Sequence, residues 1–164
     1  MIKAKCHVYG NNIDTDRIIP GKYTKTLDTA SLAQHVMEDV DPHFHLKFAV
    51  GDIIVAGDNF GCGSSREQAP LALKVAGVSC IIANFFARIF FRNAINIGLP
   101  VLEINNHDIE YSNELQIDLE NGIVHNLSKN KTYTATKLPK VMLSIMNEGG
   151  LVNYLKNHGN YQTN

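Results

Sequence analysis

The sequence predicts a single α/β domain over residues 1–164, with a mixed, partly parallel central sheet flanked by helices and a C-terminal β-hairpin. Between residues 52 and 104, strand-like and helix-like segments alternate, and this alternation predicts right-handed crossovers and parallel strand pairing. After Asn105 the pattern changes to short alternating segments around Asn121-Gly122, a residue pair that favours a tight hairpin turn. A length of 164 residues suits one domain, which would bury roughly 70% of the surface of its unfolded chain.

The first part of the chain predicts one strand, one polar loop and one helix. The strand is expected over residues 3–8, and Gly, Asn and Pro mark residues 9–21 as a loop. Polar side chains are concentrated in that loop at Asp14, Thr15, Asp16 and Arg17. They suit either a ligand site or turn capping with a surface ion pair, and the local sequence favours neither. A helix is expected to begin at Asp28 or Thr29, to include Leu32, Ala33, Val36 and Met37, and to end at Asp41-Pro42.

The later segments follow the same two patterns. Short, continuous apolar runs or strict alternation predict strands, and apolar residues at helical spacing predict helices. Strands are expected at residues 52–56, 79–84, 99–104, 114–119, 123–127 and 131–135. Helices are expected at residues 69–75, 86–97, 138–146 and 151–157. Phe86, Phe90 and Phe91 are expected to pack in the core.

Composition and charge exclude several classes of protein. The chain is 45% hydrophobic and 19% charged, and its formal net charge of −1 argues against a nucleic-acid or anionic-membrane partner. No apolar stretch is long enough to span a bilayer, and the first residues lack the apolar core of a signal peptide. We therefore expect a cytoplasmic protein.

Neither the cysteines nor the histidines have the spacing of a metal site. The three cysteines, at positions 6, 62 and 80, are odd in number and widely spaced, and they form no C-x-x-C pair. His43 and His45 have no third ligand at a suitable spacing. We expect no metal ion in this chain, with Cys6 and Cys80 in the core and Cys62 as a small residue in a tight turn.

The most informative stretch is residues 57–70, Gly-Asp-Asn-Phe-Gly-Cys-Gly-Ser-Ser-Arg-Glu-Gln-Ala-Pro, between a predicted strand and a predicted helix. Its glycines allow the backbone to approach a ligand closely. Ser64, Ser65 and Arg66 follow at the helix start, where free N–H groups and the helix dipole favour negative charge. The stretch therefore predicts an anion site with two hydroxyl groups and a guanidinium group.

Three familiar loops do not fit this stretch. A P-loop requires Gly-Lys-Ser/Thr, and no lysine lies between Gly57 and Arg66. The dinucleotide pattern G-x-G-x-x-G begins at Gly61 and Gly63 but has Arg66 in place of the third glycine. The nucleophile elbow G-x-S-x-G is also absent. Nucleotide binding and acyl transfer are therefore not expected here.

The two serines have a structural and a functional interpretation. Ser64 and Ser65 each begin a capping-box pattern, in which a serine caps the following helix. Pro70 lacks an N–H group and fits only within the first helical turn, so regular helix is expected to begin near Glu67 or later. We predict that one serine caps the helix and that the other hydroxyl is free for a ligand.

Three motifs together resemble the swivelling domain of the aconitase superfamily. They are Asn-Phe-Gly-Cys-Gly-Ser-Ser-Arg-Glu at residues 59–67, Asn-Ile-Asp-Thr-Asp-Arg-Ile-Ile-Pro at residues 12–20, and Phe-Ala-Arg-Ile-Phe-Phe-Arg-Asn at residues 86–93. With this length, essentially the whole chain is similar to the small-subunit family of 3-isopropylmalate dehydratases, which implies a β/β/α domain of the aconitase type. Gln68 departs from the family, in which His is common, and we expect it to affect the helix start or an interface.

The resemblance implies one subunit of a hydro-lyase that interconverts 2-isopropylmalate and 3-isopropylmalate by dehydration and rehydration, in leucine biosynthesis. It implies that a 4Fe-4S cluster on a large subunit binds the departing hydroxyl as a Lewis acid, so this chain would hold no cofactor and would be inactive alone. The partner would be that large subunit, in a heterodimer or heterotetramer. The implied site residues are Ser64 as the base, Asp16 as a second catalytic residue, Ser65 and Arg66 for a substrate carboxylate, and the loop backbone of Gly61, Cys62 and Gly63.

Substrate choice depends, by the same resemblance, on the loop that contains Thr24 and Lys25. An apolar residue there suits an isopropyl group, whereas Lys25 suits an additional carboxylate or points into solvent. A small hydroxy-polycarboxylate is expected, with isopropylmalate first and the substrates of homoaconitase or 2,3-dimethylmalate dehydratase as alternatives. Two other classes are a stand-alone anion-binding module, which leaves the polar loop at residues 14–17 unexplained, and a regulatory subunit, in which the serines and Arg66 are caps and surface charge.

Overall fold

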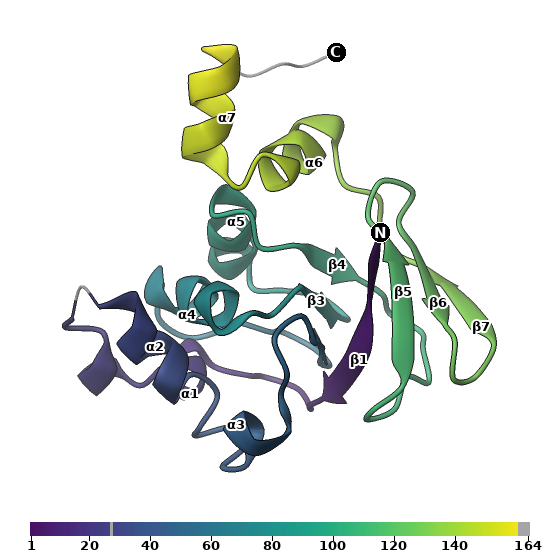
Figure 1. Ribbon diagram of the computed structural model, residues 1–164, viewed down its shortest axis with the longest axis horizontal. Coiled ribbons are helices and arrows are strands. Elements are labelled where there is room, and N and C mark those ends of the chain that lie inside the picture. Colours follow the sequence, from purple (N-terminus) through teal and green to yellow (C-terminus); the bar gives the residue numbers. More distant parts are fainter. Residues whose placement is uncertain (27, 161–164) are drawn as a thin grey trace.

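The computed structural model describes residues 1–26 and 28–160, which form a seven-stranded sheet with helices packed against it (Figure 1). The strands are β1 (Ile2–Val8), β2 (Ile53–Val55), β3 (Cys80–Ala83), β4 (Val101–Glu103), β5 (Glu114–Asp118), β6 (Ile123–Asn126) and β7 (Lys131–Thr134). The helices are α1 (Thr15–Ile18), the 3₁₀ turn η1 (Gly21–Tyr23), α2 (Thr29–His35), α3 (Phe44–Lys47), α4 (Gln68–Ala76), α5 (Arg88–Asn96), α6 (Lys140–Asn147) and α7 (Leu151–His158).

Strand β1 joins the parallel and antiparallel parts of the sheet, whose order is β4-β3-β2-β1-β5-β6-β7. Its C-terminal half pairs in parallel with β2, with Val8 opposite Val55, and β3 and β4 continue the parallel pairing. Its N-terminal half pairs antiparallel with β5, with Ile2 opposite Ile117, and β6 and β7 follow. The predicted mixed sheet and the hairpin at Asn121-Gly122 are confirmed, and β7 adds a third antiparallel strand.

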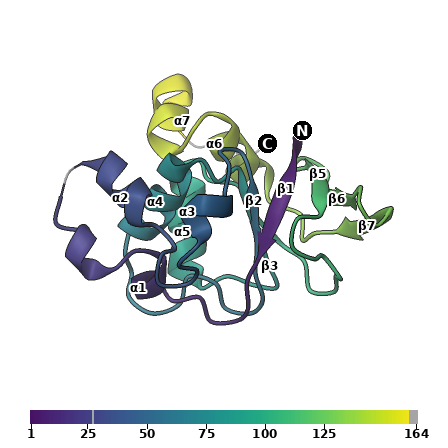
Figure 2. The ribbon, with the colours of Figure 1, turned by 60° about the horizontal axis from the view of Figure 1, so that its bottom comes forward.

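The two faces of the parallel strands are covered by different layers (Figures 1 and 2). Along β2, Ile54 belongs to a buried cluster with residues of α2, α4 and α5, whereas Ile53 and Val55 belong to a cluster with residues of β5 and β6. This alternation follows from the two-residue period of a strand. Every residue of β3 is buried, as expected for a strand covered on both faces. Helices therefore cover one face and the antiparallel strands the other, which is the predicted β/β/α layering.

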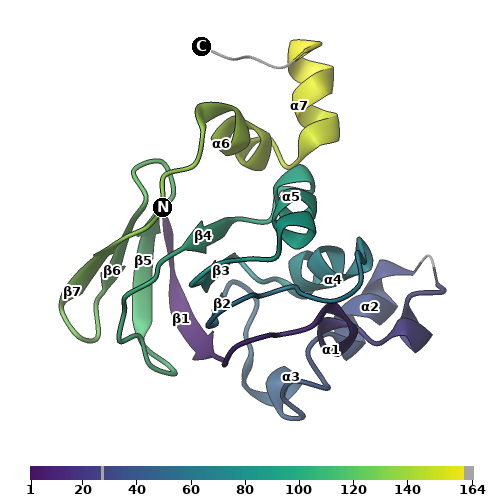
Figure 3. The same ribbon diagram turned by 180° about the vertical axis from the view of Figure 1, so that it is seen from behind.

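Helices α4 and α5 pack side by side, with α2 beyond α4 and with α6 and α7 beyond α5 (Figure 3). The helices predicted at residues 69–75, 86–97, 138–146 and 151–157 are all present, with ends shifted by a few residues. Along residues 1–26 and 28–160, no helix is both long and apolar enough to cross a membrane.

The helix predicted to reach Asp41 is shorter than expected, because α2 ends at His35. Val36 adopts an extended conformation and Met37 a left-handed one, with φ 66°. The Met37 N–H group donates to the Ile18 carbonyl at 2.7 Å, and the side chains of Val36 and Met37 are fully buried. Packing against the end of α1 therefore overrides the helical spacing of these two residues.

Strands β1, β2 and β3 are parallel, so their carboxyl ends lie at one edge of the sheet (Figure 2). The segment that leaves each strand at this edge contains one of the three motifs singled out in the sequence. Open α/β sheets bind ligands at this edge.

Candidate active site

The three motifs are joined by backbone hydrogen bonds that continue the parallel pairing beyond the strand ends. Isolated parallel bridges connect Asp14 with Cys62 and Phe60 with Phe86. The Gly61 N–H group donates to the Ile13 carbonyl at 2.8 Å, and the Ala87 N–H group donates to the Phe60 carbonyl at 2.9 Å. The loop after β2 therefore lies between the loop after β1 and the turn into α5.

Two glycines are required where this middle loop touches its neighbours. Gly61 has φ +82°, and a Cβ atom there would overlap with the Phe90 side chain. Gly63 has φ +89°, and a Cβ atom there would overlap with the Asp14 carboxylate. At both positions, a residue other than glycine would have a strained backbone conformation, and its Cβ atom would overlap with a neighbouring side chain.

The serines differ from the prediction in one respect: neither caps a helix. Helix α4 begins at Gln68, its N-cap is Glu67, and no side chain caps it. Helix α4 thus begins beyond the serines, as Pro70 predicts. The Arg66 N–H group donates to the Ser64 carbonyl at 2.9 Å and closes a turn. Arg66 and Glu67 therefore lie between the serines and the first residue of the helix. Ser64 and Ser65 are exposed, and their hydroxyl groups have no hydrogen-bond partner among the described residues.

The same loop presents free backbone donors. The N–H groups of Gly63, Ser64 and Ser65 have no acceptor within the part of the chain that the structure describes. Unpaired N–H groups on consecutive residues are available to bind an anion, and an oxyanion that they contact would be stabilised.

Arg66 lies beside these donors and is oriented by Asp16. Its Nε atom is 2.7 Å from Oδ1 of Asp16. The pair is electrostatic rather than a well-directed hydrogen bond, since the buried Nε atom has no hydrogen-bond partner among the described residues. The guanidinium group also packs against Gly21, where an added Cβ atom would lie 2.9 Å from Nη1. Its remaining donors are available for a bidentate contact with a carboxylate.

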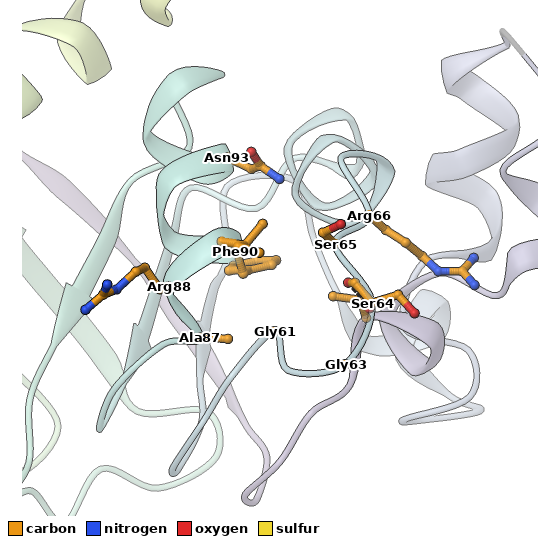
Figure 4. A pocket seen from close by; sticks show the side chains of 11 residues that line it. Gly61, Gly63, Ser64, Ser65, Arg66, Ala87, Arg88, Phe90 and Asn93 are labelled. Carbon is orange, nitrogen blue, oxygen red and sulfur yellow. Dashed lines mark hydrogen bonds between the residues drawn. The ribbon is translucent and has the colours of Figure 1, made fainter.

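A cavity of about 210 Å³ lies between this loop and the start of α5 (Figure 4). Its walls include Ser64, Ser65 and Arg66 on one side and Ala87, Phe90 and Asn93 on the other. Phe90 is also 2% exposed and packs on Phe60 with ring centroids 5.2 Å apart, so it is a core residue as predicted. Arg88 reaches the rim, but its guanidinium group points away from Ser64 (Figure 4).

Sequence reasoning gave no role to Asn93, whose side chain lines the cavity. The signal was present in the motif at residues 86–93, which ends on this asparagine. Conversely, Thr24 and Lys25 do not line the cavity: the Thr24 hydroxyl donates to the Gly21 carbonyl at 2.8 Å, and Lys25 is exposed. Gly21, in the same loop, lies next to the guanidinium group of Arg66.

The cysteines do not fit an iron–sulfur cluster. Cys6 and Cys80 are buried on the far side of the sheet, and burial raises the pKa of the Cys6 thiol to about 11. Burial, with a smaller effect of the Asp14 charge, also raises the pKa of the Cys62 thiol. Among residues 1–26 and 28–160, no three His, Cys, Asp or Glu side chains are close enough to hold a metal ion.

Known proteins resemble this chain in sequence and in fold. The family model of the aconitase C-terminal domain matches residues 4–107. The chain is 54% identical to the 3-isopropylmalate dehydratase small subunit of Caldicellulosiruptor saccharolyticus, over 95% of this chain and 91% of that protein. It is 53% identical to the 3-isopropylmalate dehydratase small subunit 1 of Thermotoga maritima, over 98% of each. A crystal structure of 3-isopropylmalate dehydratase from Methanocaldococcus jannaschii matches with a TM-score of 0.92 and 46% identity, over 96% of this chain and 95% of that one.

Proposed function

The chain belongs to the aconitase C-terminal domain family, among the small subunits of 3-isopropylmalate dehydratase, and on this premise we propose which half of the reaction it performs. It is one subunit of a hydro-lyase, and it supplies the base and the carboxylate-binding groups of a shared active site. The observation that carries this proposal is the free Ser64 hydroxyl, which lies beside unpaired backbone donors and the guanidinium group of Arg66.

Ser64 removes the proton from the carbon atom next to a substrate carboxylate. A serine hydroxyl is too weakly acidic to ionise in water, so the site has to stabilise its alkoxide form. The free N–H groups at residues 63–65 and the charge of Arg66 support this role. One such donor typically contributes about 2.7–4 kcal/mol to catalysis.

Arg66 and Ser65 bind a carboxylate of the substrate, and Asp16 orients Arg66. Asn93, on the opposite wall of the cavity, is available to the same ligand. Gly61, Cys62 and Gly63 shape the loop that surrounds the anion. Thr24 and Lys25 contact the part of the substrate that extends past Arg66, because Gly21 brings their loop next to the guanidinium group.

The partner is the large subunit, as the designation of the relatives as small subunits supports. That subunit would hold a 4Fe-4S cluster, which would supply Lewis-acid chemistry for the departing hydroxyl. The two subunits form a heterodimer or heterotetramer, with residues 1–164 of this chain as one domain. The substrate is isopropylmalate, in leucine biosynthesis, and the location is cytoplasmic.

Reconstitution of the purified chain with a cluster-loaded large subunit tests this proposal. We expect the chain alone to be inactive and the pair to hydrate 2-isopropylmaleate faster than homoaconitate or dimethylmaleate. The variant Lys25→Val in the same panel tests the second loop, and a larger preference for 2-isopropylmaleate over homoaconitate is expected. A pair that assembles but hydrates none of these acids would contradict the proposal.

A further inference from the structure

The segment that carries Ser64 has few restraints of its own. Gly63 precedes it with φ +89°, the two serine side chains are exposed, and the N–H groups at residues 63–65 are unpaired within the described chain. A base has to lie at a defined position relative to the substrate, since misplacement by about 1 Å can lower the rate about 10²-fold. Contacts from outside this segment are therefore needed to fix Ser64.

Thr15, the first residue of α1, makes hydrogen bonds on both sides of Gly63. Its N–H group donates to the Cys62 carbonyl at 2.8 Å, and its Oγ1 hydroxyl donates to the Ser64 carbonyl at 2.8 Å. Thr15 is 2% exposed, so its two donor groups are largely shielded from solvent. The side-chain bond alone can be removed by substitution, because the other bond uses the backbone.

The donor is itself held firmly. Asp14 caps α1, with its Oδ1 atom accepting from the Asp16 N–H group at 2.7 Å, and Ile18 in the same turn is fully buried. Asp16, next to Thr15, pairs with Arg66. One short helix therefore contacts both the proposed base and the proposed carboxylate-binding residue.

The bond from the Thr15 hydroxyl is not the sole hydrogen bond that the Ser64 carbonyl accepts within the described residues. The Ser64 carbonyl also accepts the Arg66 N–H group at 2.9 Å, so it keeps one partner when the threonine hydroxyl is absent. The Thr15 hydroxyl, by contrast, adds a second direction of restraint on the Ser64 backbone.

We propose that Thr15 is a positioning residue, whose hydroxyl group fixes the Ser64 backbone and thereby directs the Ser64 side chain into the cavity. This inference rests on the proposed role of Ser64. Thr15 acts through that residue and transfers no proton itself.

The test measures kcat and KM for 2-isopropylmaleate in the reconstituted complex, together with thermal unfolding of the chain. For Thr15→Val, which keeps the shape but not the hydroxyl, we expect kcat to fall about 10–100-fold while KM changes less than about threefold. Thr15→Ser restores the donor, and kcat is expected within about threefold of the parent. Thr15→Ala loses the same bond and serves as the second variant if Thr15→Val does not assemble.

Thr132→Val is the matched control, because it removes the contact of the Thr132 hydroxyl with Nδ1 of His125, on the antiparallel strands. Its kcat is expected to be unchanged. A normal kcat for Thr15→Val, or a failure of Thr15→Ser to restore it, would overturn the positioning role. Ser64→Ala separates the two proposals: if it retains turnover, the proposed function fails, whereas if it is inactive and Thr15→Val is normal, only the role of Thr15 fails.

Discussion

The Nε atom of Arg66 lies 2.7 Å from Oδ1 of Asp16, and this ion pair joins the loop after β2 to the first turn of α1. The Asp16 side chain is 55% exposed and that of Arg66 is 25% exposed. Exposed ion pairs contribute little to stability. The main effect of this pair is therefore to orient the guanidinium group of Arg66.

Replacement of Asp16 by Asn removes the charge that orients Arg66. We expect KM to rise about 10-fold in the reconstituted complex, while the free energy of unfolding of the chain changes by less than about 1 kcal/mol. Steady-state kinetics and urea unfolding measure the two quantities. Glu114→Gln is the control, because it removes an exposed pair with Lys3 between the adjacent strands β1 and β5 and should leave KM unchanged. An unchanged KM for Asp16→Asn would show that Arg66 is oriented without this pair.

Substitution of Gly63 by Ala tests the geometry of the loop. Alanine at φ +89° is strained, and its Cβ atom would overlap with the Asp14 carboxylate, so the expected loss is about 2–4 kcal/mol of unfolding free energy. Gly10→Ala is the matched control, since a Cβ atom there has nothing within 4 Å. Urea unfolding of both variants should differ by more than about 1 kcal/mol. Equal stabilities would mean that the loop accepts other conformations.

The surroundings of the Asp41 carboxyl group predict that the stability of the folded chain depends on pH. Burial raises the pKa of its carboxyl group, but hydrogen bonds from Lys47 and Tyr9 outweigh this effect and hold the pKa below its usual range. The Asp41 Oδ2 atom is 2.7 Å from Nζ of Lys47 and accepts from the Tyr9 hydroxyl at 2.9 Å. Because the folded pKa is lower than the unfolded value of about 3.9, the contribution is complete above that pH and is lost as pH falls through the folded pKa.

The variant Asp41→Asn is expected to cost about 1–3 kcal/mol at pH 7, and this cost should shrink as pH falls below about 4. Urea unfolding of both proteins across this range measures the difference. Asp39→Asn, at an exposed position two residues away, should be nearly neutral at each pH. A cost of Asp41→Asn that stays constant with pH would contradict the assignment.

Local sequence patterns predicted the parallel part of the fold well, because each strand there is a continuous apolar run between helical segments. The hairpin at Asn121-Gly122 followed from its turn residues, and Gly122 indeed has φ +65°. The two pairings of β1 were not predictable in the same way, since they depend on partners far along the chain. The prediction that Met37 lies in a helix was wrong for a related reason. Its N–H group donates to the carbonyl of Ile18, far along the chain, and not to a carbonyl of the preceding helical turn.

In the candidate site, too, some features follow from local sequence and others depend on contacts between distant segments. The predicted residues Asp16, Ser64, Ser65 and Arg66 lie together, because the strands before them end at one edge of the sheet. The capping of α4 by a serine was wrong, since the turn at Ser64 and Arg66 intervenes before the helix. The contribution of Asn93 depends on how α5 packs against the loop, which no local pattern contains.

The proposed role of Ser64 is tested most directly by Ser64→Ala in the reconstituted complex. We predict that kcat for 2-isopropylmaleate falls about 10²–10⁴-fold, with KM within about threefold of the parent and with normal assembly by size-exclusion chromatography. Ser144→Ala, on α6, should keep the parent's kcat. A Ser64→Ala complex that assembles and turns over at a near-normal rate would contradict the assignment of Ser64 as the base.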